Sequence, residues 1–130
     1  MQADPIADFL TQIRNANMAD KTEVLTPYTR LKSDIANLLA REGFVQEAEL
    51  TEIDGKQRLK VVMKTGQRIK PIRGLKKVSK PGRREYVGAK NLPRVLGGFG
   101  FAVISTSKGI LTDQEARKEN IGGEVLLHIW

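Results

Sequence analysis

The chain opens with apolar residues at helical spacing. Asp4 is a residue type that caps helices, and Pro5 suits the first helical position, where its missing N–H needs no partner. The pattern therefore predicts a helix from Pro5 to about Met18. Its core side carries the apolar residues Ile6, Phe9, Leu10 and Ile13. Its polar side carries Arg14, Asn15 and Asn17.

The following segments predict a short strand and a second helix. Residues 23–28 form the strand, which Pro27 confines to a sheet edge or a strand end. A second amphipathic pattern then predicts a helix that Gly43 ends. The apolar positions of this helix are Leu31, Ile35, Leu38 and Leu39.

Two strands follow, over residues 44–52 and 56–64, and Asp54-Gly55 between them is a strong hairpin pattern. In the second strand, apolar and mostly basic positions alternate, so one face should lie in a core. The apolar positions are Leu59, Val61 and Met63. The predicted order is helix, strand, helix, strand, strand.

Beyond a connector at residues 66–71 the pattern changes to short strands and turns. The predicted elements are strands at residues 72–79 and 84–87 around a Lys80-Pro81-Gly82 turn, a helical turn at 91–96, a glycine-rich break at 97–100, a strand at 101–106 and a final strand at 124–130. Thr112 and Glu115 match a capping box, which predicts a short helix. We therefore expect an α+β fold of two small lobes, residues 1–66 and residues 67–130, the second mainly β with a short helix.

Positive charge is concentrated in one third of the chain. Residues 54–94 contain fourteen Lys or Arg and two acids, a net charge of +12, whereas the remaining residues carry −5 and the whole chain +7. An ordinary solvent-exposed face would carry acidic residues among the basic ones. Because this segment has almost none, it indicates a polyanionic partner such as nucleic acid. Lys76 and Lys77 are then candidates for phosphate contacts.

The composition excludes several kinds of site. The chain has no cysteine and one histidine, His128, so it offers neither disulfides nor a plausible zinc site. Its N-terminus lacks a basic region followed by an apolar run, and no apolar stretch approaches the roughly 20 residues that span a bilayer. We expect a cytoplasmic protein without cofactor, metal or membrane association.

Short matches to enzyme motifs do not combine into a catalytic site. Residues 105–108 fit S-x-x-K and residues 64–66 fit K-T-G, motifs of penicillin-binding enzymes, but their order is reversed and the chain is too small for that fold. Gly98 and Gly100 lack the third glycine of a dinucleotide fingerprint. His128 lies in an apolar strand, which favours a structural role. We expect no enzymatic activity.

Two features have both a structural and a functional interpretation. Residues 105–109, Ser-Thr-Ser-Lys-Gly, either form a polar turn or contact RNA, since hydroxyls bond phosphates, 2′-OH groups and base edges. Tyr86 is either half-buried in a strand or free to stack on an unpaired base. The basic residues around Tyr86 in the sequence are Lys80, Arg83, Arg84 and Lys90.

Several ordered motifs along the chain match one family. They are Asp4-Pro5-Ile6-Ala7-Asp8-Phe9-Leu10 with Ile13-Arg14-Asn15, Arg41-Glu42-Gly43-Phe44, Val78-Ser79-Lys80-Pro81-Gly82, Leu92-Pro93-Arg94-Val95-Leu96, Ile104-Ser105-Thr106-Ser107-Lys108-Gly109 with Leu111-Thr112-Asp113 and Glu115-Ala116-Arg117, and Gly122-Gly123-Glu124-Val125 with Trp130. In this order they resemble bacterial ribosomal protein eight of the small subunit, the S-eight family, over the whole chain.

The resemblance implies a function. Members of that family bind the central domain of small-subunit ribosomal RNA, mainly through the C-terminal lobe, and help to organise the platform of the subunit. They adjoin the fifth small-subunit protein, and in some bacteria they repress their own operon by binding a similar mRNA structure. The resemblance thus implies a structural, RNA-binding protein of the cytoplasmic ribosome.

The resemblance also implies site residues. It places Ser105, Thr106 and Ser107 in the RNA-contacting loop. It places Lys108, Gly122, Gly123, Glu124 and Tyr86 around that loop, and Arg14 and Asn15 near RNA on the first helix. Lys80, Arg83 and Arg84 complete the expected set as neighbouring cations.

Two positions depart from the family's pattern. Arg83 follows Pro81-Gly82 where an apolar residue is usual, which adds charge and leaves open how that strand edge packs. His128 stands where the family often has an aromatic residue. The alternative function, a DNA-binding or regulatory module, would need a helix with basic and amide side chains for a major groove. The positive charge here lies mainly on predicted strands and turns.

Overall fold

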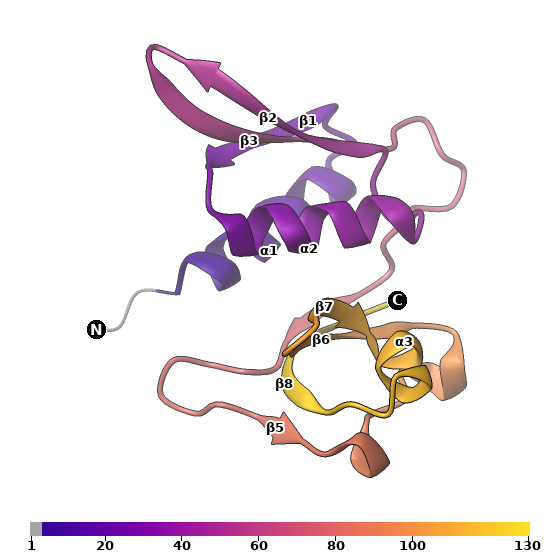
Figure 1. Ribbon diagram of the computed structural model, residues 1–130. Helices are drawn as coiled ribbons and strands as arrows, with labels where there is room; N and C mark the ends of the chain where they lie inside the picture. The colour runs from indigo at the N-terminus through magenta and orange to yellow at the C-terminus, as the bar shows by residue number, and fades with distance from the viewer. Residues whose placement is uncertain (1–3) are drawn as a thin grey trace. The chain divides into compact units, whose positions relative to one another are not determined.

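The computed structural model describes residues 4–130 and has an α+β architecture (Figure 1). The chain forms two compact units, Ile6–Ile72 and Arg73–Trp130, and Asp4 and Pro5 belong with the second. Both units combine helical segments with antiparallel strands. The predicted α+β class is confirmed.

In the N-terminal unit two helices cover one face of a three-stranded antiparallel sheet (Figure 1). The helices are α1 (Pro5–Met18) and α2 (Arg30–Arg41). The strands are β1 (Glu23–Pro27), β2 (Glu47–Ile53) and β3 (Lys56–Val62), in the order β1-β3-β2. All five predicted elements are present in the predicted order, and β2 begins three residues later than expected.

Alternation along β3 separates the two faces of this sheet as predicted. Leu59 and Val61 are completely buried, and Met63 just beyond the strand is buried too. Between them, the Lys60 ammonium on the outward face lies 3.3 Å from the Glu23 carboxylate and 3.5 Å from that of Glu49. The hydrogen bond and the charge of Glu23, with those of Glu49, raise the pKa of Lys60 above its ordinary value.

Each of the helices α1 and α2 has one buried polar residue. Asn17, expected on the polar side of α1, donates to the carbonyl of Ile72 (2.7 Å) and accepts from its amide (3.3 Å). The prediction that Asn17 lies on the polar side is wrong, because a polar side chain can be buried when its donors and acceptors have hydrogen-bond partners. Lys32 of α2 is also buried and donates to the Thr26 hydroxyl and the Pro27 carbonyl.

The C-terminal unit is built on a second antiparallel sheet. Its strands are β4 (Leu75–Lys77), β5 (Tyr86–Val87), β6 (Phe101–Thr106), β7 (Gly109–Thr112) and β8 (Gly123–Ile129). Their order is β4-β8-β6-β7, with β5 also paired to β8. The helix α3 (Asp113–Lys118) packs on β6 and β7, and the short turns η1 (Ala89–Asn91) and η2 (Leu96–Gly98) precede β6.

The α3 capping box confirms the prediction from Thr112 and Glu115. The Thr112 hydroxyl accepts from the Glu115 amide (3.1 Å), and the Glu115 carboxylate accepts from the Thr112 amide (3.0 Å). The sequence suggests that Asp113 only caps the helix, but the structure gives this residue a second role. Its buried carboxylate accepts from the Ala102 amide (2.9 Å) and from Arg117 (2.6 Å), which ties α3 to β6.

Several predicted boundaries in this unit are wrong. The helical turn expected at residues 91–96 is absent, and η1 and η2 lie on either side of that stretch. The sequence pattern does not predict the strand β7, because four residues are too few to show an alternation. The strand expected at residues 72–79 shrinks to β4, since β8 has an irregular register between the partners of Val103 and Ile104 that interrupts the regular ladder.

Candidate nucleic-acid interface

The strand register aligns three of the expected site residues in one row. Tyr86 on β5 and Ser105 on β6 are both cross-strand partners of Glu124 on β8, from opposite sides. Their neighbours Ile104 and Val125 are buried in the core under α3, so the row lies on the opposite face. Tyr86 is 69% exposed, which rules out half-burial and leaves its ring free to stack.

The β6–β7 turn divides its hydroxyls between two roles. Thr106 donates to the Gly109 carbonyl (2.8 Å) and accepts from the Lys108 amide (3.1 Å), so its hydroxyl holds the turn. Gly109 has a φ of 106°, which glycine adopts without strain. The hydroxyls of Ser105 and Ser107 make no hydrogen bond within residues 4–130, and Ser107 is exposed. The structural interpretation therefore holds for Thr106, while Ser105 and Ser107 remain available to a ligand.

Lys108 extends from this turn toward α3. Its ammonium lies 3.0 Å from the carboxylate of Glu119, and both side chains are more than half exposed. An exposed ion pair contributes little to stability because water and salt screen it. Lys108 can therefore exchange this partner for a phosphate at small cost.

Gly122 and Gly123 allow three strands to approach one another closely. A Cβ on Gly123 would lie 2.1 Å from the Ser105 carbonyl oxygen, and one on Gly122 would lie 2.2 Å from that of Val87. No side chain fits at either position without a shift of the backbone. The two glycines thus serve the sheet beneath the expected site, and the sequence alone did not distinguish this role from ligand contact.

Glu124 is held by its own chain. Its carboxylate accepts a short hydrogen bond from the buried Ser79 hydroxyl and lies 3.2 Å from the Arg84 guanidinium. The Ser79 oxygen in turn accepts from the Glu85 amide at 3.3 Å. Glu124 therefore positions the segment before β5, and it partly neutralises Arg84.

The Lys80–Arg83 turn projects two further cations. The two residues exchange backbone hydrogen bonds of 3.1 and 2.9 Å across Pro81 and Gly82, as the Pro-Gly pattern predicts. The guanidinium of Arg83 is exposed and lies 3.4 Å from the Glu85 carboxylate, so this residue faces solvent rather than a packed strand edge. Lys80 is exposed, and no carboxylate of residues 4–130 lies within ion-pair distance of it.

Comparison with known proteins identifies the family. The family model for ribosomal protein S8 matches residues 4–130. The chain belongs to the ribosomal protein S8 family. It is similar to the small ribosomal subunit protein uS8 of Lactobacillus delbrueckii subsp. bulgaricus, with 53% identity over 98% of this chain and 97% of the relative. The uS8 proteins of Streptococcus sanguinis (50% identity) and Enterococcus faecalis (49%) are each matched over 100% of this chain and 99% of their own length.

Membership in the ribosomal protein S8 family confirms that the chain is a structural ribosomal protein and not an enzyme. In the S-x-x-K match at residues 105–108, the Lys108 ammonium pairs with Glu119 and not with the Ser105 hydroxyl. Within residues 4–130, no group of three or more His, Asp or Glu side chains is placed to hold a metal ion. None of the helices there has the length and apolar character needed to cross a bilayer.

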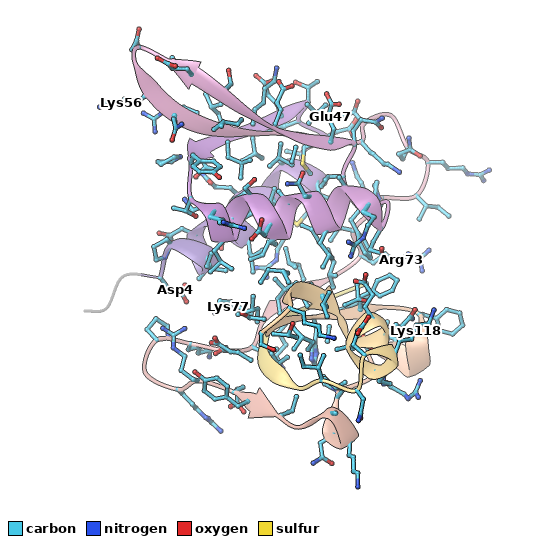
Figure 2. The ribbon with its side chains drawn as sticks, viewed as in Figure 1. Asp4, Glu47, Lys56, Arg73, Lys77 and Lys118 are labelled. Carbon is cyan, nitrogen blue, oxygen red and sulfur yellow. The ribbon has the colours of Figure 1, made fainter. Side chains whose placement is uncertain are left out.

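In the folded chain, nearby carboxylates offset part of the positive charge of residues 54–94. At least five of the fourteen cations in this segment face carboxylates, most of them from outside the segment. Lys77, for example, is 13% exposed and lies 3.7 Å from the Asp4 carboxylate (Figure 2). The other four are Lys60, Lys70, Arg83 and Arg84. Charge summed along the sequence therefore overstates the surface available to phosphates.

His128 on β8 is half-buried and lies opposite Lys76 in the sheet. Burial lowers the pKa of His128 below its ordinary value, the positive charge of Lys76 lowers it further, and Asp113 opposes both. The environment therefore favours the neutral form of the imidazole, which packs in the sheet. Two of the expected site residues, Arg14 and Asn15, belong to the N-terminal unit. Both lie on α1 and are exposed.

Proposed function

We propose that the chain binds the central domain of small-subunit ribosomal RNA through its C-terminal lobe, residues 67–130, and helps to assemble the platform of the subunit. As a member of the ribosomal protein S8 family, it is a structural component of the small subunit and acts in the cytoplasmic ribosome. The observation that carries the proposal is the row of Tyr86, Glu124 and Ser105 beside the exposed Ser107 of the β6–β7 turn.

The chemistry of this surface suits a distorted RNA helix. An A-form groove hides base edges from side chains, whereas unpaired bases in an internal loop can be stacked and hydrogen-bonded. Tyr86 offers an exposed ring for stacking, and Ser105 and Ser107 offer hydroxyls to 2′-OH groups and phosphate oxygens. Binding of this kind reads shape and exposed bases rather than a duplex sequence.

Cations at the edges of the surface add attraction that depends on salt. Lys80 has no carboxylate partner among the described residues, and Lys108 has only the exposed Glu119. Each phosphate that they neutralise releases counterions. These two lysines, with Arg83 and Arg84 nearby in the sequence, supply affinity, and the hydroxyls and Tyr86 supply selectivity.

The proposal is tested by a Ser107→Ala variant on two RNAs, an internally looped helix from the central domain and a regular duplex of equal length. We expect roughly a tenfold loss of affinity on the looped helix, since a good hydrogen bond to a charged or polar RNA group is worth about 1–3 kcal/mol. Little change is expected on the duplex. An equal loss on both RNAs would contradict shape recognition. A chemical footprint on whole ribosomal RNA at two salt concentrations locates the target.

We also propose two further partners that the family resemblance implies. A region of the operon mRNA that folds into a similar looped helix would compete for it, which provides a route to translational repression. The fifth small-subunit protein is the proposed protein neighbour. Competition between the mRNA and rRNA fragments for the purified protein tests the first of these, and the two RNAs should exclude each other if they share the site.

A further inference from the structure

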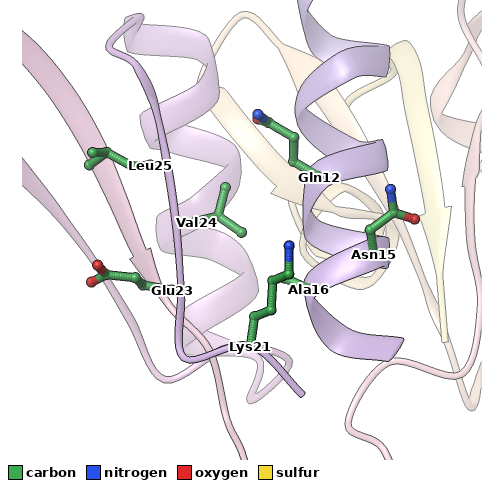
Figure 3. Close-up of a pocket in the computed structure, with 7 residues that line it drawn as sticks. All are labelled: Gln12, Asn15, Ala16, Lys21, Glu23, Val24 and Leu25. Atoms are coloured by element: carbon green, nitrogen blue, oxygen red, sulfur yellow. The ribbon is translucent and has the colours of Figure 1, made fainter. Parts of the chain in front are cut away.

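The hollow between α1 and β1 in the N-terminal unit is small (Figure 3). Its volume is about 220 Å³, below the range of roughly 300–1,000 Å³ that is typical of ligand sites. A polar contact of the C-terminal unit has a clearer consequence for function. It joins the buried hydroxyl of Ser79 to the carboxylate of Glu124.

The two oxygens of the Glu124 carboxylate have different surroundings. Oε2 accepts from the Ser79 hydroxyl and lies 3.2 Å from Nη1 of Arg84. Oε1 makes no hydrogen bond within residues 4–130. Because the buried side-chain nitrogens and oxygens of those residues all have hydrogen-bond partners, Oε1 must reach solvent. One oxygen is therefore held by the fold, and the other is open to a ligand.

Ser79 is the firmer of the two contacts at Oε2. It is completely buried, and its hydroxyl oxygen accepts from the Glu85 amide (3.3 Å) while its one proton is donated to Glu124. The Arg84 side chain is 51% exposed, and water and salt screen an ion pair made by such a side chain. Ser79 therefore holds the carboxylate from inside the fold, and Arg84 offsets part of its charge from the surface.

The open oxygen belongs to the row of residues that faces a ligand. Tyr86 and Ser105 flank Glu124 on the two neighbouring strands. A carboxylate only accepts hydrogen bonds, so Oε1 can pair with a donor but not with a negatively charged phosphate oxygen. Unpaired bases and 2′-OH groups are the donors that a distorted RNA helix presents. Oε1 therefore favours a base N–H or a 2′-OH over a phosphate.

We propose that Ser79 is a positioning residue for RNA recognition. By fixing Oε2 of Glu124, it aims Oε1 at one base N–H or 2′-OH group of the RNA. Ordering a long side chain at the moment of binding lowers affinity, so a carboxylate that is already held binds more tightly. This role rests on the proposed function, and it assigns part of the selectivity to a buried residue that does not touch the RNA.

The test is a double-mutant cycle on the full chain, made of Ser79→Ala, Glu124→Ala and the two together. The affinity of each variant is measured for the internally looped helix and for a regular duplex of equal length. Thr112→Ala is the matched control, because Thr112 is also buried in the C-terminal unit and its hydroxyl also accepts from one backbone amide, that of Glu115 (3.1 Å). Circular dichroism identifies a temperature at which all the variants are folded.

On the looped helix, Ser79→Ala should weaken binding roughly three- to tenfold, the effect of having to order one side chain on binding. Glu124→Ala should weaken binding at least as much. Adding Ser79→Ala to Glu124→Ala should then change the affinity by less than about twofold, because Ser79 acts through Glu124. Thr112→Ala should bind the looped helix as the wild type does, and neither Ser79→Ala nor Thr112→Ala should alter binding to the duplex.

The outcomes separate the role of Ser79 from the proposed function. If the wild type does not bind the looped helix, the proposed function fails and the positioning role fails with it. If the wild type binds but the losses from Ser79→Ala and Glu124→Ala add, Ser79 acts through the fold and not through Glu124, so the positioning role alone is wrong. Unchanged affinity of Ser79→Ala, or an equal loss in Thr112→Ala, has the same meaning.

A second variant covers the case in which Ser79→Ala does not fold. Ser79→Cys places a thiol in the same buried position, and a thiol is only a weak donor. It should weaken binding to the looped helix in the wild-type background and have no further effect in the Glu124→Ala background. Any other pattern would contradict the positioning role.

Discussion

The buried hydroxyl of Ser79 donates a hydrogen bond to the carboxylate of Glu124, 45 residues later in the chain. The same hydroxyl oxygen accepts from the Glu85 amide, and Arg84 contacts the same carboxylate oxygen at 3.2 Å. One serine therefore joins the segment before β5 to β8. Tyr86 follows this segment directly and pairs with Glu124 across β5 and β8.

Replacing Ser79 by alanine should lower the free energy of unfolding by about 1–3 kcal/mol, because the Glu85 amide and the Glu124 carboxylate both lose a buried partner. Urea unfolding followed by circular dichroism measures the change. Ser107→Ala is the matched control, since its exposed hydroxyl makes no hydrogen bond within residues 4–130, and it should change stability by less than about 0.5 kcal/mol. Equal effects of the two variants would contradict the role of Ser79.

Gly123→Ala should destabilise the C-terminal unit by about 1–3 kcal/mol, the usual range for forcing an extra group into a packed site. The new Cβ would lie 2.1 Å from the Ser105 carbonyl oxygen, so β6 and β8 must separate. Gly88→Ala provides the comparison, because it has open space for a Cβ and a φ of −80°. Thermal melting should rank Gly123→Ala clearly below the wild type, with Gly88→Ala at or slightly above it.

His128 should titrate below the ordinary histidine pKa of 6.5, because burial and Lys76 both disfavour its charged form. In the unfolded chain the imidazole takes up its proton near pH 6.5, earlier than in the fold, so the free energy of unfolding should fall as pH drops below that value. NMR is suited to this measurement since the chain has one histidine. Lys76→Gln should raise the pKa of His128 toward 6.5, and a pKa at or above 6.5 in the wild type would refute the account.

Lys80→Ala should reduce the salt dependence of binding to the looped helix by about one counterion, as expected when one phosphate contact is lost. Lys77→Ala should leave that slope unchanged, although the charge of the segment suggests Lys77 as a phosphate contact. The structure separates them because Lys77 is 13% exposed and pairs with Asp4, whereas Lys80 is exposed and unpaired within residues 4–130. Affinity measured across a range of salt concentrations distinguishes the two, and equal slopes for both variants would contradict the assignment.

The N-terminal unit illustrates what short-range patterns can predict. Helix α1, helix α2 and the β2–β3 hairpin follow from apolar spacing and from Asp54-Gly55, since each pattern reflects one buried face or one local backbone conformation. The polar residues Asn17 and Lys32 could not be placed this way. Asn17 is buried because its amide meets Ile72, 55 residues later, and no local pattern records that partner.

The candidate interface shows the same division. The residue types of the loop at 105–109, and their resemblance to the S8 family, indicated RNA from the sequence alone. The sequence could not show that Thr106 is held by the turn while Ser107 is free, nor that Gly122 and Gly123 serve strand packing.

By itself, then, the sequence determined the α+β class, most of the helices and strands, and the family, because periodicity, caps and motif order are properties of neighbouring residues. The tertiary structure decided which side chains are available to a ligand. Whether a side chain is available depends on its partners elsewhere in the chain. Glu124 is bound by Ser79 and Arg84, and Lys77 forms an ion pair with Asp4. The partners of a charge, and not its place in the sequence, decide whether it can meet a phosphate.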